Sequence, residues 1–575
     1  MNLKKKIIIL LTISILVMLT ACGTKKNPIK KGVISSLPAT TDFVASIDSI
    51  KTVFDTFSIK EDSILGNKIK NKNDFDEISK FLGINILNIK EIEKTGVDVT
   101  KLITLSMDIE KIEQIKKEYC WDNNLYDETG KVKGTEKKCN SYDSEDALVN
   151  LSIMIPIKNR SLFINKIEEL VKKENSVSIK TEKELRTIYF KDGKKEFNGY
   201  LFPRGEYFVF TISLSGDLKT DHALKSFNSI KRLSDSKSYN IVRKKISTAD
   251  GISLFFNVNG FIKKHEDFFK KTLNKLPSYK SNYKNMLLYS LDTFKGYNFF
   301  ATTISLKSKD LHIKTFADVV KGSFIEKGSK NIVYNRDYVL GIKDKVLAIL
   351  SFGFNVDVVY KELKETLNKN IEKSEKKISA NLGISIYDDI ISQLGGNFNF
   401  GVYDAIGINP MNHNFVSTFT IKDSKKFATT ISKLTDKFNS MITSEKRDNL
   451  LIYTLRTPAM INLYFTIKGN SLIFTTSKTF FDKALNVNGK GDIYSVAKKN
   501  NFLKQLNGEN LLFLDFYELT KVLDNFGIGK FNKFIKPFNT LSISSKYENQ
   551  LFSGEFLLKT NSDKNFYQFL SDSFK

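Results

Sequence analysis

The chain has 575 residues, of which 41% are hydrophobic and 27% are charged, with 30 glycines and 8 prolines. These proportions exclude a collagen-like chain, a disordered tail protein and a polytopic membrane protein, and the length predicts about two to four globular domains. The net charge of +25 is typical of proteins that bind anionic partners, but only 8 of the 89 basic residues are arginines, so we expect no nucleic-acid partner.

The chain begins with a segment typical of export signals. Lysines at positions 4–6 precede an uncharged, apolar run over residues 7–20, which closes on Leu19-Thr20-Ala21-Cys22. The run is shorter than the roughly 20 apolar residues that span a bilayer, and it ends at small residues. It resembles the signal peptide of bacterial lipoprotein precursors, whose lipobox is a leucine, two small residues and a cysteine.

This resemblance implies cleavage after Ala21, a diacylglycerol on the Cys22 thiol and acylation of the new amino group, with palmitate as an expected chain. We therefore expect a signal peptide over residues 1–21 and a lipid-bearing, flexible tether over 22–32. The protein would be held outside the cytoplasm on a bacterial membrane, and Gly23 favours the outer membrane where the organism has one. An ordinary secretory peptide, in which Cys22 is incidental, is the alternative.

The body of the chain alternates strand and helix patterns. Residues 151–157 alternate as a half-buried strand does, Asn159 is a good N-cap, and helical spacing follows. Three short strands come next, within residues 187–213, and Gly205 lies in the hairpin between the last two. Further strands flank this block at 43–47, 102–107, 252–256, 297–306 and 311–316.

Residues 110–146 interrupt this pattern as a charged, turn-rich insertion that we expect to be exposed. It holds Cys120 and Cys139, which would be the only thiols left once Cys22 is acylated, so an oxidising compartment favours a disulfide between them. A metal or redox pair is the alternative, although CxxC spacing and neighbouring histidines are missing. The single tryptophan, Trp121, is a candidate contact for a partner unless it packs on the disulfide of its own loop.

The chain also matches itself at a shift of 264 residues. The matched positions are Ile157 and Ile421, Phe163 and Phe427, Ile188 and Ile452, Gly205 and Gly469, and Phe210 and Phe474. We therefore predict an α+β fold with two tandem homologous units, residues 33–325 and 336–575. Each unit is expected to be a mainly antiparallel sheet covered by helices, which gives two sheets related by a pseudo-twofold axis.

The sequence contains no HExxH, GxSxG, Walker, EF-hand or CxxC motif. Its four histidines are widely separated, and we interpret each as a surface or structural residue: His222, His265, His312 and His413. Neighbouring acidic pairs such as Asp388-Asp389 point to different sides of a predicted helix and cannot share a proton. We therefore predict no catalytic residue, no metal, no cofactor and no enzymatic activity.

Three soft patterns carry a resemblance to an uncharacterised family of exported, internally duplicated bacterial proteins of unknown function. They are the segment Leu37 to Asp42 before an apolar strand, the Gly96-Val97-Asp98 and Leu394-Gly395-Gly396 segments, and the repeated strand, Lys-Asn or Lys-Asp, helix block. The resemblance implies no site residue.

We therefore expect a lipid-anchored extracytoplasmic envelope protein that acts as a non-enzymatic scaffold or interaction module. Its partners would be the membrane, through Cys22, and an envelope protein or a lipid. A binding protein for an apolar or lipid-like ligand, held in a groove lined by some of the 46 phenylalanines, is the first alternative. An extracytoplasmic hydrolase is the second.

Overall fold

The computed structural model describes residues 37–57, 79, 82–85, 87–126, 128, 131–192, 195–214, 228, 231–236, 239–240, 251–275, 281–306, 308–367, 369–404, 414–457 and 461–573. The expected signal peptide, the cleavage site at Ala21, the lipidation site at Cys22 and the tether over 22–32 lie outside these residues. Among the residues described, no helix combines the length and the apolar character needed to cross a membrane.

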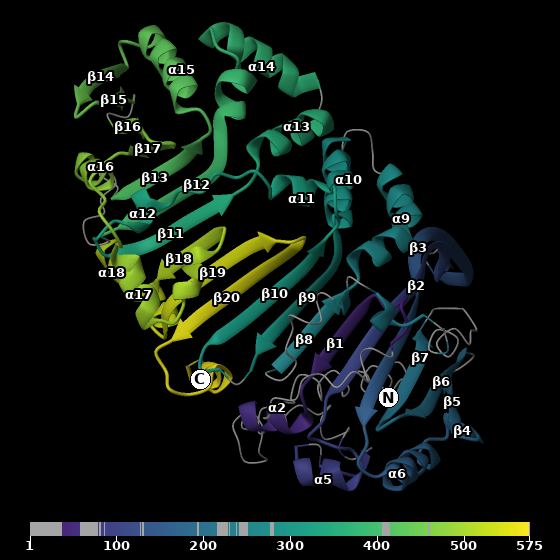
Figure 1. The fold of residues 1–575 in the computed structure, drawn as a ribbon. Coiled ribbons are helices and arrows are strands. Elements are labelled where there is room, and N and C mark those ends of the chain that lie inside the picture. The colour runs from purple at the N-terminus through teal and green to yellow at the C-terminus, as the bar shows by residue number, and fades with distance from the viewer. Residues whose placement is uncertain are drawn as a thin grey trace.

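In the part of the chain that the structure describes, twenty strands form one continuous antiparallel sheet (Figure 1). In the first half of the chain the order across the sheet is β4, β5, β6, β7, β3, β2, β1, β8, β9, β10. The strands are β1 (Phe43–Ile47), β2 (Ile103–Tyr126), β3 (Val132–Pro156), β4 (Val177–Glu182), β5 (Leu185–Asp192), β6 (Lys195–Arg204), β7 (Tyr207–Leu214), β8 (Gly251–Phe256), β9 (Tyr297–Ser305) and β10 (Leu311–Val319).

The second half repeats this connectivity strand by strand. Its order is β14, β15, β16, β17, β13, β12, β11, β18, β19, β20. The strands are β11 (Val346–Gly353), β12 (Leu394–Tyr403), β13 (Phe415–Ile421), β14 (Ile442–Arg447), β15 (Leu450–Arg456), β16 (Asn462–Lys468), β17 (Ser471–Thr475), β18 (Asn510–Asp515), β19 (Phe538–Glu548) and β20 (Leu551–Thr560).

Local features recur at matching places in the two halves. Asn159 caps the helix after β3 by accepting a hydrogen bond from the Leu162 N–H at 3.1 Å, and Asp423 caps the helix after β13 in the same way. Gly205 lies in the hairpin between β6 and β7, and Gly469 lies in the hairpin between β16 and β17, with φ of +60° and +57°. Only a left-handed residue closes such a tight turn, which explains why glycine stands at both positions.

The expectation of two separate sheets is wrong, because residues 311–318 of β10 pair with residues 551–558 of β20 and join the halves. Each of these strands ends its half, so each would otherwise expose a row of unpaired N–H and C=O groups. An ion pair and a hydrogen bond reinforce the junction: Lys559 Nζ lies 2.7 Å from Asp310, and His312 Nε2 lies 2.5 Å from Glu555.

Helices pack on the sheet and bury apolar side chains in three cores, whose members include Val53 and Phe163, Phe480 and Phe513, and Leu37 and Tyr239. The α-helices are α2 (Ile50–Phe57), α5 (Ile89–Lys94), α6 (Arg160–Lys172), α9 (Val258–Asn274), α10 (Ser281–Lys295), α11 (Phe324–Gly328), α12 (Asp337–Leu340), α13 (Val356–Leu367), α14 (Lys369–Leu382), α15 (Ser424–Lys437), α16 (Lys478–Leu485), α17 (Asp492–Lys499), α18 (Phe516–Asn525), α19 (Asn532–Ile535) and α20 (Phe566–Ser573).

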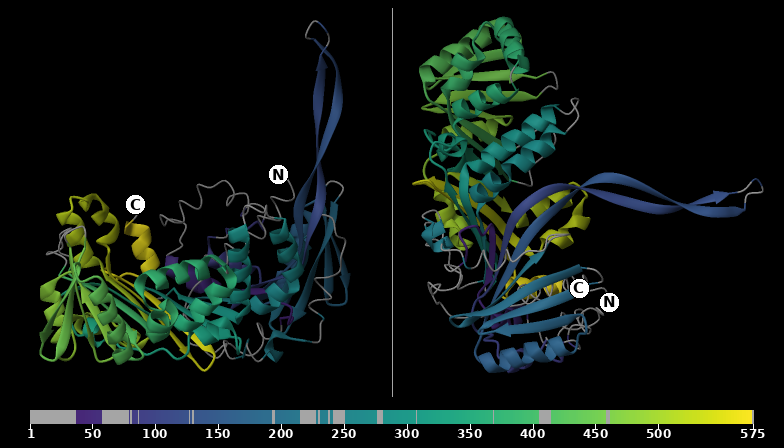
Figure 2. Two further views of the ribbon diagram at one scale, coloured as in Figure 1. Left: turned by 90° about the horizontal axis from the view of Figure 1, so that it is seen from above. Right: turned by 90° about the vertical axis from the view of Figure 1, so that its right-hand side faces the viewer.

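Strands β2 and β3 continue beyond the sheet as a two-stranded ribbon, which projects away from the rest of the molecule in both views of Figure 2. Strand β1 pairs with β2 only as far as Met107, and β7 pairs with β3 only from Val149 onward. Residues 111–148 pair only with each other among the described strands. Together with Glu110, which precedes them, these residues form the segment 110–148 that we call the ribbon.

The ribbon corrects the expectation of a turn-rich loop over residues 110–146. Side chains 131–141 are all exposed, so both faces of this part of β3 meet solvent and the sequence shows no alternation of apolar and polar residues. Cys120 and Cys139 stand directly opposite each other in the register, and the expected disulfide joins them.

Candidate functional site

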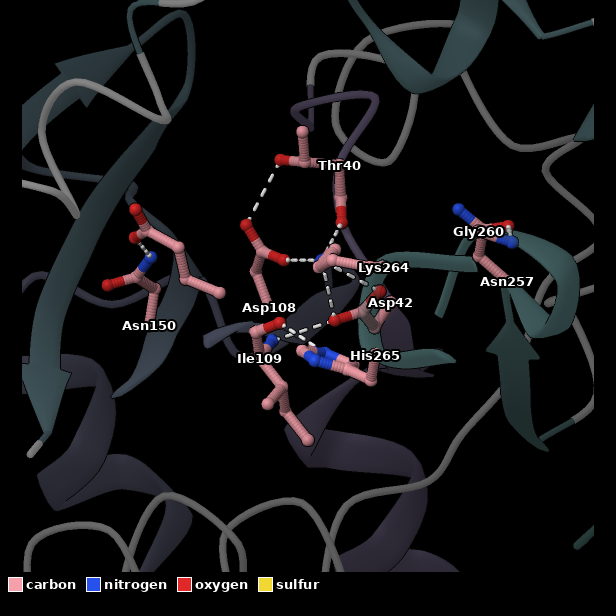
Figure 3. Close-up of polar contacts among 10 residues, drawn as sticks. Thr40, Asp42, Asp108, Ile109, Asn150, Asn257, Gly260, Lys264 and His265 are labelled. Atoms are coloured by element: carbon pink, nitrogen blue, oxygen red, sulfur yellow. Dashed lines mark hydrogen bonds and ion pairs between the residues drawn. The ribbon is translucent and has the colours of Figure 1, made fainter. Parts of the chain in front are cut away.

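A cluster of charged and polar side chains lies at the root of the ribbon, where β2 leaves the sheet (Figure 3). Asp42 directly precedes β1, Asp108 follows the last residue of β2 that pairs with β1, and Lys264 and His265 are consecutive residues of α9. The root cluster consists of these four residues together with Thr40.

Lys264 joins the two carboxylates of the root cluster. Its Nζ lies 3.0 Å from both carboxylate oxygens of Asp42 and 2.5 Å from Oδ1 of Asp108. The Thr40 hydroxyl donates to the other oxygen of Asp108 at 3.0 Å. One ammonium group therefore faces two carboxylates, so the site carries a net negative charge whenever both carboxylates are ionised.

The root cluster also satisfies the backbone of Ile109, the residue at which β2 has lost its neighbour β1. The Ile109 N–H donates to Asp42 Oδ2 at 2.7 Å, and its carbonyl accepts a hydrogen bond from His265 Nε2 at 2.8 Å. Buried backbone groups need such partners, and the two side chains replace the missing strand. Because a carbonyl only accepts, His265 must carry its proton on Nε2.

The opposite side of the root is held by a second contact. Asn150 of β3 is buried; its amide donates to the Glu110 carboxylate at 3.1 Å, and its side-chain oxygen accepts from the Ser213 hydroxyl of β7 at 2.7 Å. The ribbon is therefore fastened to α9 and β1 on one side and to β7 on the other.

Local structure places the helical members of the root cluster. Asn257 caps α9 by accepting from the Gly260 N–H at 3.1 Å, and its own N–H donates to the Asp42 carbonyl at 2.7 Å. These bonds fix the start of α9 beside β1, so that the second turn of the helix brings Lys264 and His265 to the strand. The Phe261 ring packs edge-on against His265 at 4.9 Å.

Burial controls the protonation of this site. The Asp42 side chain is 1% exposed, and this burial raises its pKa to about 7 against the opposing effect of Lys264, with the nearby charge of Asp108 adding to the rise. Burial also lowers the pKa of His265, which is therefore a neutral imidazole at pH 7. The arrangement can hold a strand in place and take up a proton near neutral pH.

Among the described residues of the second half, the equivalent place on α18 carries no lysine. Lys264 lies seven residues after the cap Asn257, and Val522 lies seven residues after the corresponding cap Asp515. Strand β12, the counterpart of β2, ends at Tyr403 instead of continuing. Among the described residues, the root cluster is therefore found in the half of the chain that carries the ribbon.

The residues selected from the sequence lie elsewhere. Cys120, Cys139 and Trp121 belong to the ribbon; Trp121 is half-buried and stands opposite Lys138 in the register. Sequence reasoning missed the root cluster and treated His265 as structural. The only signal in the sequence was Asp42, which ends the segment Leu37 to Asp42 noted above, because the other members come from segments far apart in the chain. His222 and His413 lie outside the described residues, and within the described residues no three His, Cys, Asp or Glu side chains are grouped to hold a metal ion.

Comparisons with known proteins give distant matches. No family model matches the chain. The protein Ycf2 of Physcomitrium patens is 24% identical over 471 residues, which is 72% of this chain and 20% of that protein. The chain thus spans about a fifth of the length of this curated relative.

Two crystal structures of TP0453 were also matched. Crystal form III gives a TM-score of 0.23 at 13% identity and covers 41% of this chain and 85% of that chain. Crystal form I gives a TM-score of 0.21 at 10% identity and covers 43% of this chain and 100% of that chain. At these values the matches assign neither a family nor a function.

Proposed function

We propose that this chain is a lipid-anchored extracytoplasmic protein of a bacterial envelope and that it acts, without catalysis, as an interaction module. In this proposal acyl chains on Cys22 hold the protein at the membrane, and the ribbon contacts another envelope protein. The observation that best supports this proposal is the ribbon. Residues 111–148 pair only with each other among the described strands, and the Cys120–Cys139 disulfide links the two strands of the ribbon.

A projecting ribbon has the physical properties of a recognition element. An isolated two-stranded hairpin is marginally stable in water, and both of its edges carry backbone groups that a third strand can pair with. The disulfide, with a sequence separation of 19, stabilises the hairpin by about 3 kcal/mol in the chain-entropy model. The root cluster supports the same role because it fixes where the ribbon leaves the body.

The net charge of the ribbon favours a partner whose contact surface is basic. The ribbon has seven lysines and ten acidic residues between positions 110 and 146, which gives it a net charge of −3 in a chain whose total is +25. Complementary charge steers association and excludes other partners. Trp121 is the candidate anchor of the contact, because tryptophan is enriched among the residues that dominate binding energy.

The location proposal depends on two observations. The lipobox-like Leu19 to Cys22 segment supports the anchor, and the disulfide supports an oxidising compartment outside the cytoplasm. We further propose that the two halves descend from a duplicated unit. The repeated order of strand pairing, the matched caps at Asn159 and Asp423, and the shift of 264 residues support this descent.

Site-specific photo-crosslinking tests the proposed function. Benzoylphenylalanine is placed at position 121 of the full chain and, as a control, at position 162, where Leu162 is exposed on α6. In intact cells we expect one protein adduct of discrete mass from position 121 that position 162 does not give, and the purified adduct partner should bind the unmodified chain. Equal adducts at both positions, or none at position 121, would overturn the ribbon as the contact.

The alternative of a binding protein finds support in one cavity of about 320 Å³ beside α18. It is lined by Lys499, Asn500, Asp515, Phe516, Tyr517, Thr520, Lys536, Phe538, Asn539, Thr540 and Asn561. The size is within the range of small-molecule sites, and the many polar groups suit a headgroup better than an acyl chain. For an extracytoplasmic hydrolase the root cluster offers little, since Lys264 holds both of its carboxylates.

A further inference from the structure

The helical hairpin formed by α18, the turn after it and α19, residues 516–538, concentrates exposed apolar side chains at the margin of the molecule (left in Figure 1). Five large apolar side chains within this segment are between 39% and 65% exposed: Tyr517, Phe526, Ile528, Phe531 and Phe534. Soluble proteins rarely gather exposed apolar residues in this way unless the surface binds something.

The hairpin has a defined, hydrogen-bonded structure, so its apolar side chains are not exposed because of a frayed segment. Gly527 adopts a left-handed φ of +70°, and the Ile528 N–H donates to the Leu523 carbonyl at 2.9 Å to close the turn. Asn532 is buried, and its amide donates to Asp524 Oδ1 at 2.6 Å and to the Thr520 carbonyl at 3.4 Å. These bonds fold α19 back along α18.

Basic residues alternate with the aromatic ones. Residues 525–538 contain three lysines and no acidic residue. Lys530 Nζ lies 5.9 Å from the centre of the Phe531 ring, and Lys521 Nζ lies 4.1 Å from that of Tyr517. The hairpin also contains two acids: Glu518 is paired with Lys521 at 2.7 Å, and Asp524 accepts the hydrogen bond from Asn532.

We propose that this hairpin docks on the surface of an anionic lipid bilayer. Aromatic side chains prefer the headgroup region, and lysines beside them contact lipid phosphates, each strengthening binding roughly fivefold on a charged surface. Tyr517 and Lys536 also line the cavity beside α18, which places polar groups next to the docking surface. This contact is independent of acylation at Cys22 and of the ribbon.

Vesicle sedimentation tests the proposal with residues 23–575, which include every described residue and lack the acylated position. We expect binding to vesicles that contain phosphatidylglycerol and at least tenfold weaker binding to pure phosphatidylcholine. Phe526→Ser with Phe531→Ser should weaken the binding about tenfold. Lys530→Glu with Lys536→Glu should weaken it more than about 25-fold, since each substitution removes a positive charge and adds a negative one.

Matched controls change equally exposed residues elsewhere, namely Leu162→Ser with Ile378→Ser and Lys425→Glu with Lys446→Glu. They should bind as the parent does, and thermal unfolding should show all variants folded. The proposal is overturned if the parent does not distinguish the two lipids, if the controls weaken binding equally, or if the hairpin variants only dissociate a dimer. The last result would assign the surface to a second copy of the chain.

Discussion

The root cluster shows how one cation organises buried acids. Asp42 accepts hydrogen bonds from both Lys264 and the Ile109 N–H while its side chain is only 1% exposed. The single residues that matter here come from positions 42, 108 and 264, and neither spacing nor composition links them. By contrast, the helix caps Asn159 and Asp423 were predictable, because a cap depends only on the few residues that follow it.

Replacing Lys264 with methionine should destabilise the fold by about 3 kcal/mol at pH 8, because it leaves a buried carboxylate without its counter-ion. The loss should be smaller at pH 5, where Asp42 takes up a proton. Denaturant unfolding measures both values. Lys263→Met, at the exposed neighbouring position of α9, is the matched control and should change stability by less than about 0.5 kcal/mol.

The raised pKa of Asp42 predicts a particular pH dependence. Its pKa is about 7 in the folded state against 3.8 ordinarily, so the folded state binds this proton more tightly than the unfolded state does. The contribution of Asp42 to stability should therefore decrease as the pH rises from about 4 to about 7 and stay constant on either side. Compared with Asp42→Asn, the parent should lose roughly 3 kcal/mol between pH 5 and pH 8. A parent that gains stability over this range relative to the variant would show the opposite shift.

At the scale of elements, apolar periodicity located strands β1, β8, β9 and β10 of the first half, since such periodicity survives on a half-buried sheet. The ribbon was missed because side chains 131–141 are exposed on both faces, so no alternation of apolar and polar residues marks this part of it. Its cysteines were still informative. Cys120 and Cys139, the two cysteines that remain if Cys22 is acylated, predicted a bond that a hairpin places at directly opposed positions.

The disulfide should stabilise the ribbon and little else. In Cys120→Ser with Cys139→Ser, amide hydrogen exchange in the ribbon should accelerate at least tenfold, whereas exchange in β8 to β10 should be unchanged, because ribbon residues pair only with each other. Asn123→Ser with Glu136→Ser, which alters a neighbouring cross-strand pair, should leave exchange close to that of the parent. Equal acceleration throughout the sheet would mean that the bond supports the body as well.

At the scale of the whole molecule, the joining of the halves could not be predicted from patterns within either half. It depends on two strand edges, β10 and β20, that lie about 240 residues apart and meet only in the folded chain. The pairing of β10 with β20 joins the strands of the two halves into one sheet. The halves should therefore depend on each other for stability.

This dependence predicts one cooperative thermal unfolding transition for the two halves. Asp310→Ala removes the partner of Lys559 at the junction and should lower the single midpoint by a few degrees without splitting it. Asp563→Ala, which breaks the exposed pair with Lys309, should have little effect. Two separate transitions in the parent would show that the halves unfold independently.

Metabolic labelling with a radioactive fatty acid tests directly whether acyl chains on Cys22 hold the protein at the membrane. Cells that express the full chain should yield a labelled, membrane-bound product, whereas Cys22→Ser should be unlabelled and leave the membrane fraction, with Cys120 and Cys139 unchanged as internal controls. An unlabelled parent, or a Cys22→Ser chain that carries as much label as the parent, would contradict lipid anchoring.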